Sequence, residues 1–549
     1  MSTALRLKNI LNILTVCLRV FFGARLVSTT LPTFSRRSLC KMQVKSLSEM
    51  RDKVVVIGSG ISGLTAAVLL NRKGYDVVVL EKQSQAGGAL HRFKRQGVSF
   101  DVGFHYTGGL GHGEILQALW NYCTISKHLD ILPFPDNAAD HVRVDGLSKP
   151  ARAFFSYDRF SEELFRLFPS EKEGIKRFFK TIREHGHSIP FYNMTEPVSP
   201  FLRKLAFPEQ YSLADLLTSC TTDSRLHAIL SLPVFLHGVQ PDNIGLTMHA
   251  SVAHPVYTGM YTVDGGGQAI ADAYLHVLGE SGVQVHTATP VEQILTESNH
   301  VTGVRTIKGV FPATAVIYTG HPSRLPAMVE ETVLRKAYRT RLLELHNTCS
   351  MFMVFGAVSK NSLNDKLRWN NYYALPASFD IPQVHPKNPE DCFFLSGAGL
   401  RDTKYLKKSN KNRAVTLIRP ASWQESSRFD RGRKKRTGDY LDWKQEEADK
   451  IVRSVNRYWD GLLDDFRVIN TASPLTFRDE LDYVHGAAYG VKHSMDQFAV
   501  GARTRLPGLW LSGQSTLMPG ILGASLSALI TVGGFVGLES IWQEITECA

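Results

Sequence analysis

The chain has few cysteines for its length, and they form no pattern. Seven cysteines are scattered over 549 residues, with no C-x-x-C and no cluster of cysteines and histidines. An odd, dispersed set argues against a disulfide framework, a zinc site and a dithiol redox centre. The sequence also lacks a Ser-His-Asp order and the paired-carboxylate spacing that would indicate hydrolysis. We therefore predict no metal site and no hydrolase.

Acidic residues are absent from the first 48 residues, which carry eight Lys/Arg. The uncharged apolar run within them, Ile10 to Leu18, is far shorter than the ~20 residues that a membrane-spanning helix needs. An acid-free leader with arginines is typical of an organelle transit peptide, whereas basic residues before a short apolar run also fit a secretory signal or an interfacial helix. We predict a targeting leader over residues 1–48, directed to the mitochondrion or, peripherally, to the endoplasmic reticulum membrane.

A glycine-rich turn follows the leader, between two runs of β-branched residues. The stretch Gly58-Ser59-Gly60-Ile61-Ser62-Gly63 joins the predicted strand Val54 to Ile57 to a predicted helix that ends near Gly74. In a Rossmann-type unit, such glycines permit the tight turn, the approach of a pyrophosphate and close packing of the helix, whose N-terminus offers N–H donors to phosphates. The next predicted strand, Asp76 to Leu80, presents Glu81 about twenty residues later, where a carboxylate binds ribose. This spacing predicts a dinucleotide site.

A double glycine after this unit favours FAD over NAD(P). Ala86-Gly87-Gly88 resembles the backbone segment with which glutathione-reductase-like and amine-oxidase-like flavoproteins wrap an extended FAD. Near the other end of the chain, the predicted strand Leu509 to Leu511 leads into Gly513-Gln514 and a helix, which resembles the segment beside the flavin ring in the same proteins. The predicted FAD-binding residues are Gly58, Ser59, Gly60, Ile61, Ser62, Gly63, Glu81, Lys82, Gly87, Gly88, Val291, Gly513, Gln514, Gly520 and Ile521.

The C-terminal glycine-rich stretch has a second interpretation, as a membrane anchor. Residues 507–538 contain no charge and are long enough to span a bilayer. Pro519 and seven glycines interrupt the stretch at positions that suit a strand, a loop and a helix packed inside an α/β domain. We therefore predict a buried flavin-binding segment rather than a transmembrane helix.

The remaining segments indicate a nucleotide-binding domain that is split along the chain. Val263-Asp264-Gly265-Gly266-Gly267, a helix and three β-like runs up to Thr319 have the order expected where such a domain re-enters its own sheet. We predict an α/β fold, in which a split Rossmann-type FAD-binding domain carries an inserted mixed α+β substrate domain. The predicted boundaries are 1–48 for the leader, 49–152 for the first FAD-binding part, 153–258 for a helical insertion for substrate or membrane, 259–324 for the second FAD-binding part, 325–474 for the substrate domain and 475–549 for the C-terminal FAD-binding part.

Motifs along the chain after the leader carry one family resemblance. They include VVIGSGISGL (Val55 to Leu64), LEKQSQAGGALHRF (Leu80 to Phe93), FDVGFHYTGG (Phe100 to Gly109), HGAAYG (His485 to Gly490) and GLWLSGQSTLMPGILGA (Gly508 to Ala524). On these residues the protein resembles the phytoene-desaturase-like flavoproteins, most closely the branch of retinol saturases (all-trans-retinol 13,14-reductases) and carotenoid cis-trans isomerases. FDxGxHYxG is the most discriminating motif, because the saturase branch carries it and simple amine oxidases do not. YTVDGGG departs from the saturase pattern.

The resemblance implies an FAD-dependent oxidoreductase that saturates or isomerises a C=C bond of a conjugated isoprenoid, a retinoid or a carotenoid. A desaturase or an amine-oxidase-like enzyme of the same fold is one alternative. A flavin-fold protein that binds isoprenoids without turnover is another. Only one dinucleotide fingerprint is visible, so the electron donor is left open between free NAD(P)H, a quinone and a partner protein.

Saturation of a double bond requires the protein itself to deliver a proton. A reduced flavin gives hydride to one carbon of a double bond, while a positioned acid protonates the other. Histidine carries protons near neutral pH, and His105 with Tyr106 lies in the discriminating motif behind the FAD-wrapping glycines. The predicted catalytic residues are His105, Tyr106 and His249, and His485 lies in another family-matching segment. A purely structural hydrogen bond is the alternative role for each histidine.

Two features bear on substrate and partners. The helical insertion is rich in phenylalanine, which suits either an apolar substrate channel or an ordinary core. Basic stretches at Lys404 to Arg413 and Arg428 to Arg436 contribute to the net charge of +12. No nucleic-acid recognition fold accompanies them, so we expect solvated loops or peripheral contact with anionic lipid, and no nucleic acid partner. The sequence leaves the oligomeric state open.

Overall fold

The computed structural model describes residues 52–205, 209–359, 366–377, 389–403 and 412–549. The predicted targeting leader, residues 1–48, lies outside the described residues, and so does most of the basic stretch Lys404 to Arg413.

A five-stranded parallel sheet carries the glycine-rich turn. Its strand order is β19-β13-β1-β2-β9, and every neighbouring pair is parallel. The strands are β1 (Lys53–Ile57), β2 (Asp76–Leu80), β9 (Gln284–His286), β13 (Ala315–Tyr318) and β19 (Leu509–Leu511). Continuous β-branched runs such as Val54 to Val56 are fully buried, as expected for a parallel sheet covered on both faces. Because the strands come from three distant segments, the sheet confirms the predicted split Rossmann-type domain.

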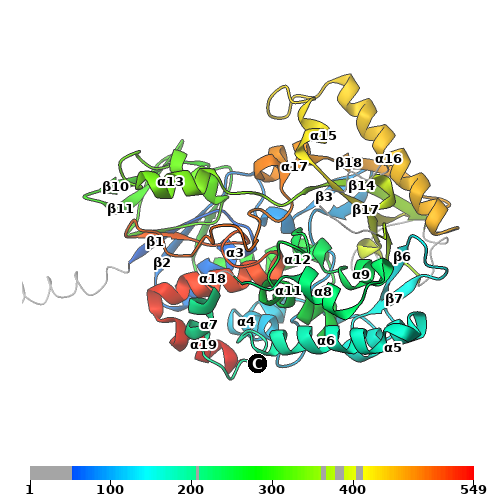
Figure 1. Ribbon diagram of the computed structural model, residues 1–549. Coiled ribbons are helices and arrows are strands. Elements are labelled where there is room, and N and C mark those ends of the chain that lie inside the picture. The colour runs from blue at the N-terminus through cyan, green and yellow to red at the C-terminus, as the bar shows by residue number, and fades with distance from the viewer. Residues whose placement is uncertain (1–51, 206–208, 360–365, 378–388, 404–411) are drawn as a thin grey trace, which may run out of the picture. The chain divides into compact units, whose positions relative to one another are not determined.

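Helices from both ends of the chain cover this sheet. They are α3 (Ile61–Arg72), α12 (Gly266–Glu280) and α18 (Gly520–Val536), while α19 (Leu538–Thr546) packs on α18 and α4 (Ile115–Tyr122) packs on α19. Helix α18 packs beside α3 (Figure 1), and its residues from Leu522 to Leu529 are all buried. The Ser62 and Ser512 hydroxyls meet at 2.6 Å between the two ends of the chain. The uncharged C-terminal stretch is thus a strand, a loop and a packed helix. Among the described residues, no helix has the length and apolar character needed to span a membrane.

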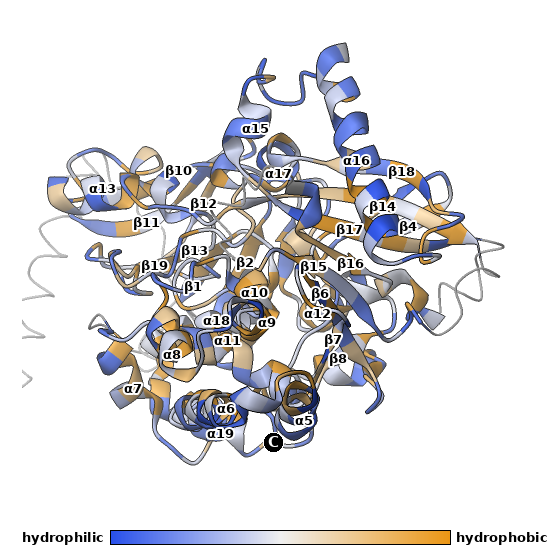
Figure 2. Ribbon diagram, turned by 45° about the vertical axis from the view of Figure 1, so that its right-hand side comes forward, coloured by the Kyte–Doolittle hydropathy of each residue, from blue (hydrophilic) through white to orange (hydrophobic). Residues whose placement is uncertain are grey.

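A seven-stranded mixed sheet forms the second layer of β-structure. Its order is β18-β14-β17-β16-β15-β6-β7, with β15 and β6 parallel and the other pairs antiparallel. The strands are β6 (Ala139–Val144), β7 (Ala151–Phe154), β14 (Ser350–Ser359), β15 (Asn371–Leu375), β16 (Phe393–Ser396), β17 (Asn412–Ala421) and β18 (Arg467–Ala472). The amphipathic helix α16 (Gly438–Tyr458) packs on it with Ile451 and Val455, and carries mainly hydrophilic residues elsewhere (Figure 2). Strand β6 and the first half of β7 lie before residue 153. The mixed sheet therefore includes strands from residues 49–152, which we predicted to be the first FAD-binding part.

The helical insertion supplies a core rather than a channel along most of its length. Its helices are α5 (Tyr157–Leu167), α6 (Lys172–His187), α7 (Val198–Leu205), α8 (Leu213–Cys220), α9 (Ser224–Leu230), α10 (Val234–His237) and α11 (Leu246–Thr258). Phe160, Phe168, Phe178 and Phe179 are buried together in one hydrophobic cluster. The phenylalanine-rich pattern therefore reflects helix packing in the main.

Shorter elements connect these layers. They are β3 (Arg92–Arg95), β4 (Val98–Asp101), β5 (Ile131–Pro133), β8 (Tyr261–Val263), β10 (Val291–Glu297), β11 (His300–Thr306), β12 (Gly309–Pro312), α13 (Lys336–Leu343), α15 (Trp423–Ser427) and α17 (Pro474–Leu481). The basic stretch Arg428 to Arg436 lies next to α17, where Arg436 pairs with Asp479 at 2.5 Å and Lys434 with Glu480 at 3.2 Å. Part of its charge is thus neutralised within the chain.

Candidate functional site

The glycine-rich turn forms an open cradle at the N-terminus of α3. Gly58 has φ +101°, and a Cβ atom there would lie 2.3 Å from the Thr319 Oγ1 atom, so only glycine fits. Gly60 is the N-cap of α3, where no side chain caps the helix, and no heavy atom lies within 4 Å of the position that a Cβ would take. The first turn of α3 therefore directs N–H groups into free space. This arrangement fits the pyrophosphate of a dinucleotide.

Glu81 closes the cradle at the end of β2, where its side chain is buried. Its Oε2 atom accepts hydrogen bonds from the Ser59 N–H at 2.9 Å and the Ser59 hydroxyl at 2.7 Å, and its Oε1 atom accepts one from the Gln83 N–H at 2.8 Å. An ionised carboxylate has about four acceptor positions, so capacity remains for ribose hydroxyls. Val291 begins β10 directly after a loop whose Thr289 N–H donates to the Glu81 carbonyl at 2.8 Å, which brings Val291 towards the same end of the site.

Lys82 points away from this cradle. Its Nζ atom lies 2.5 Å from the Asp482 Oδ2 atom, and burial lowers the pKa of its ammonium despite that pairing. The role of Lys82 in FAD binding stays a prediction, and the structure gives its side chain another partner.

The double glycine and the C-terminal segment meet the fingerprint as the FAD interpretation requires. The Gly87 N–H donates to the Ser59 carbonyl at 3.1 Å, and a Cβ on Gly88 would lie 3.1 Å from the Gly60 Cα atom. Beyond β19, the Gly513 N–H donates to the Ser527 hydroxyl at 2.9 Å, and the Gln514 carbonyl accepts from the His493 ring. The double glycine thus lies against the fingerprint, and the contact between Ser62 and Ser512 places the end of β19 beside α3, where FAD would bind.

An apolar cavity of about 200 Å³ opens at the start of α18. Its walls come from the FDVGFHYTGG loop, from α10 and α11, from strands β14 to β17 and from residues 518–523 at the start of α18. His105, Tyr106, Gly520 and Ile521, four of the residues predicted from sequence, lie together in its lining. Among the described residues that line this cavity, none is Asp, Glu, Lys or Arg. The space therefore suits an uncharged, hydrocarbon-like group.

His105 is held neutral in this cavity wall. Burial lowers the pKa of His105 to about 4; the Asp101 carboxylate opposes this shift and the Arg401 guanidinium adds to it. Its Nδ1 atom has no hydrogen-bond partner within the part of the chain that the structure describes. A neutral imidazole is a weak acid near pH 7, so His105 is better placed to orient a group than to protonate one.

The other two predicted histidines lie elsewhere. His249 is buried in α11 away from the cavity lining, with its Nδ1 atom 3.1 Å from the His237 Nε2 atom, and burial lowers its pKa to about 3. His485 is exposed against the Trp423 ring. The structure therefore brings His105 and Tyr106 together and separates them from His249 and His485. A catalytic role for His249 stays a prediction without support from its position.

Sequence reasoning missed a buried polar cluster behind Tyr106. The Arg401 guanidinium donates to the His105 carbonyl at 3.1 Å and to the Asn371 Oδ1 atom at 2.9 Å. Asn371 Nδ2 in turn donates to the Asp140 Oδ1 atom at 2.7 Å. Asn371 faces Asp140 because β15 and β6 pair in parallel at this register. No local motif marks these residues, since strand pairing alone assembles them.

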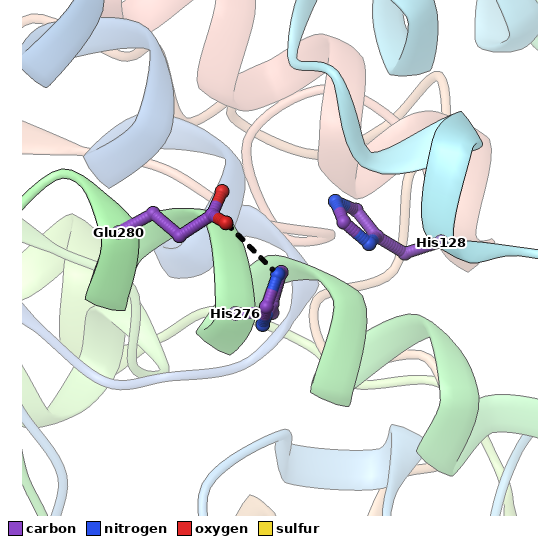
Figure 3. Close-up of side chains that lie close together, drawn as sticks. All are labelled: His128, His276 and Glu280. Carbon is purple, nitrogen blue, oxygen red and sulfur yellow. Dashed lines mark ion pairs between the residues drawn. The ribbon is translucent and has the colours of Figure 1, made fainter.

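One further group of chemically active side chains lies on the surface (Figure 3). His276 and Glu280, one turn apart on α12, form an ion pair at 3.2 Å, and the His128 ring lies 4.5 Å from that of His276. Their candidate ligand atoms lie within 4.8 Å of one another, and all three residues are exposed. An ordinary i, i+4 helix pair accounts for this arrangement. This cluster does not test our prediction that the chain has no metal site.

The uncapped helix cradle, the buried Glu81 and the wrapped glycines define a dinucleotide-dependent oxidoreductase of the Rossmann type. A family model described as "Flavin containing amine oxidoreductase" matches residues 61–357, and the chain belongs to this family.

Individual relatives support the resemblance noted from sequence. The chain is 26% identical over 527 residues to an all-trans-retinol 13,14-reductase of Danio rerio, with 88% of this chain and 85% of that protein covered. It is 31% identical over 275 residues to prolycopene isomerase 2, chloroplastic, of an Oncidium hybrid cultivar, with 46% of each covered. An oxidoreductase structure from Methanosarcina mazei superposes with a TM-score of 0.63 at 16% identity, covering 87% of this chain and 99% of that one, and so shares its fold.

Proposed function

We propose that this protein is an FAD-dependent enzyme that saturates a C=C bond of a conjugated isoprenoid, in the manner of a retinol 13,14-reductase. The observation that carries the proposal is the uncharged cavity at the start of α18, where the FDVGFHYTGG loop faces the residues that would hold the flavin. A polyene has no charge to neutralise, so a site without ionised side chains in its wall binds it without a desolvation penalty. The similarity to all-trans-retinol 13,14-reductase over 88% of the chain favours the same substrate class.

The residues of the chain have distinct tasks in this reaction. The N-terminus of α3 and Glu81 would hold the pyrophosphate and the ribose, while Gly513, Gln514, Gly520 and Ile521 would border the flavin ring. A bound reduced flavin supplies hydride to one carbon of the double bond. The protein must then hold the polyene against the ring, exclude water from the cavity and deliver a proton to the second carbon.

Two alternatives use the same cavity. Isomerisation of a poly-cis carotenoid needs only transient exchange with the reduced flavin, and the similarity to prolycopene isomerase 2 supports it. Oxidation of an uncharged amine is the second, because Tyr106, Tyr373, Tyr489 and Phe394 give the cavity aromatic walls. We propose also that the enzyme works at a membrane surface in an organelle, mitochondrion or endoplasmic reticulum, since its apolar substrate resides in lipid.

Product analysis separates these reactions. The purified protein would be reduced chemically under anaerobic conditions and incubated with all-trans-retinol or with a poly-cis carotenoid, and the mass and retention time of the product measured. A gain of two hydrogens supports the saturase. An unchanged mass with a shifted retention time establishes the isomerase instead. Unchanged polyenes, together with hydrogen peroxide release from an amine in air, would replace the proposal with amine oxidation.

A further inference from the structure

A second, smaller cavity lies on the far side of Tyr106. Its volume is about 20 Å³, which is room for one water molecule. Tyr106 and Tyr373 line both cavities, whereas Asp140 and Tyr257 line the small one. The Tyr257 hydroxyl is buried and has no hydrogen-bond partner among the described residues. Polar groups therefore converge on this space from β6, β15, α11 and the FDVGFHYTGG loop.

Asp140 is connected to the large cavity by hydroxyl groups. The Tyr106 and Tyr373 hydroxyl oxygens are 3.1 Å apart, and Tyr373 and Asp140 both line the small cavity, where one water molecule would bridge them. Asp140 is 4% exposed and Tyr373 is 2% exposed. A buried carboxyl is costly, and Arg401 reaches this one only through the side chain of Asn371.

We propose that Asp140 and Tyr373 form a proton relay that recharges Tyr106, and that Tyr106 protonates the substrate carbon that does not receive hydride. The relay rests on the proposed function, because it deepens the saturation reaction of the same cavity. Tyr106 is the catalytic residue, and Asp140 and Tyr373 act through it.

The step balances without a further reactant. The Tyr106 O–H bond breaks as a C–H bond forms on the substrate, while the hydride and its two electrons come from the reduced flavin. The Tyr106 oxygen takes the proton of the Tyr373 hydroxyl, the Tyr373 oxygen takes a proton from the water of the small cavity, and that water takes the proton of the Asp140 carboxyl. The resulting carboxylate regains a proton from solvent between turnovers through the water of the small cavity. The double bond gains two hydrogens and the flavin is oxidised.

The electrostatics of the cluster suit this direction of transfer. Burial raises the pKa of Asp140 to about 7, against the opposing effects of Asn371, Arg401 and Tyr373, so the carboxyl holds a proton near neutral pH. The other titratable groups around it keep their charge state, because burial raises the pKa of Tyr106, Tyr373 and Tyr257 and Arg401 stays cationic with a pKa of about 10. Asp140 is thus the group of the cluster that titrates in the working range.

Three variants test the relay in the full chain. Asp140→Asn keeps the shape of the carboxyl without its proton, and Tyr373→Phe removes the middle hydroxyl. Tyr440→Phe is the matched control. Tyr440, in α16, is also buried, and its hydroxyl contacts one other hydroxyl, that of Ser473 at 2.7 Å. The rate at which an accepted polyene oxidises the reduced flavin is followed against pH by stopped-flow absorbance.

Kinetics give the first readout. For the unchanged protein, we expect the rate of flavin oxidation to fall as the pH rises through about 7, where Asp140 loses its proton. Asp140→Asn should lower the rate about 10²-fold and abolish this inflection, since general acid catalysis contributes 10² or more. Tyr373→Phe should lower it similarly, and Tyr440→Phe should change neither rate nor inflection. An inflection that survives in Asp140→Asn overturns the relay, even where the polyene is reduced.

Infrared difference spectroscopy of the flavin-free protein gives a second readout that needs no turnover. A protonated-carboxyl band should disappear as the pH is raised across about 7, be missing in Asp140→Asn and shift in Tyr373→Phe, while Tyr440→Phe keeps it in place. Absence of such a band overturns the relay. If no polyene oxidises the flavin but the band titrates and shifts with Tyr373→Phe, the connected proton chain is supported and the substrate of the proposed function is wrong.

Discussion

The cofactor cradle and the polar cluster behind Tyr106 are built on opposite principles. The cradle at Gly58 to Gly63 works by lacking side chains, and its donors are backbone N–H groups at a helix N-terminus. The cluster of Asp140, Asn371 and Arg401 works by side chains whose polar atoms are buried and bonded to one another. Substitutions that add atoms should therefore damage the cradle, whereas substitutions that remove atoms should damage the cluster.

The largest effect is expected where an atom is added to the cradle. Gly60→Val should abolish flavin retention, because its side chain would fill the free space in which the pyrophosphate lies. The Gly60 backbone has φ −65° and ψ 174°, which valine adopts, so the chain itself should fold. Flavin absorbance of the purified protein is the measurement. Gly279→Val is the control, since Gly279 is exposed in α12 with equally open surroundings. A Gly60→Val protein that still purifies yellow would contradict the assignment.

Removal of the Arg401 side chain should cause the next largest loss. The guanidinium is 1% exposed and donates to the Arg368 and His105 carbonyls and to Asn371. Arg401→Leu leaves these acceptors buried without a donor, so the free energy of unfolding should fall by about 5 kcal/mol in urea denaturation. Arg166→Leu removes a half-exposed guanidinium from Glu163, which keeps Arg152 as a partner, and should cost less than about 1 kcal/mol. Equal losses would show that burial of Arg401 does not matter.

The protonation of Asp140 should appear in the pH dependence of stability. Its pKa is raised from 3.8 to about 7 by folding, so between these values the unfolded chain releases a proton that the folded chain keeps. Stability from this group is complete below about pH 4 and is lost as the pH rises through 7, by about 4 kcal/mol. Asp140→Asn should not lose this stability, because its amide does not titrate. The difference in unfolding free energy between the two proteins, measured by denaturant titration at several pH values, should therefore shift in favour of Asp140→Asn; a constant difference would refute the raised pKa.

A smaller effect is expected at His105. His105→Ala should lower turnover about tenfold, 1.4 kcal/mol in barrier height, through lost positioning in the cavity wall. Flavin should stay bound, and the pH profile between about 5 and 8 should keep its shape because the pKa of His105 is about 4. Steady-state turnover and flavin absorbance test this, with the exposed His485→Ala as control. Loss of an inflection near neutral pH in His105→Ala would instead make this imidazole the acid.

The smallest effect is expected for Lys82, whose side chain lies outside the cradle. Lys82→Met breaks a partly exposed ion pair with Asp482 and should lower the free energy of unfolding by less than about 1 kcal/mol. Because the side chain points to Asp482, flavin content should be unchanged. Thermal unfolding and flavin absorbance of the variant measure both quantities, and a colourless variant would return Lys82 to the cofactor site.

The same contrast explains what the sequence could predict. Gly58, Gly60, Glu81 and Gly87 belong to motifs of fixed spacing, so the Rossmann-type domain and its cofactor cradle are predictable from local sequence. Asp140, Asn371 and Arg401 are far apart in sequence, and only the parallel pairing of β6 with β15 brings the first two together. The sequence already favoured His105, in the most discriminating motif, over His249 as a proton carrier, but only the packing of α11 shows that His249 contacts His237 and does not line the cavity.

Strand β19 and the contact between Ser62 and Ser512 have a consequence for biosynthesis. One edge of β13 pairs with β1, and the other is completed by β19, which is synthesised long after β13. A nascent chain therefore exposes an unpaired, β-branched strand edge from the synthesis of β13 until that of β19, and such an edge is a template for aggregation. Because β19 completes the sheet and the start of α18 lines the cavity, a stop codon placed before β19 should yield colourless, aggregation-prone protein rather than a shortened enzyme.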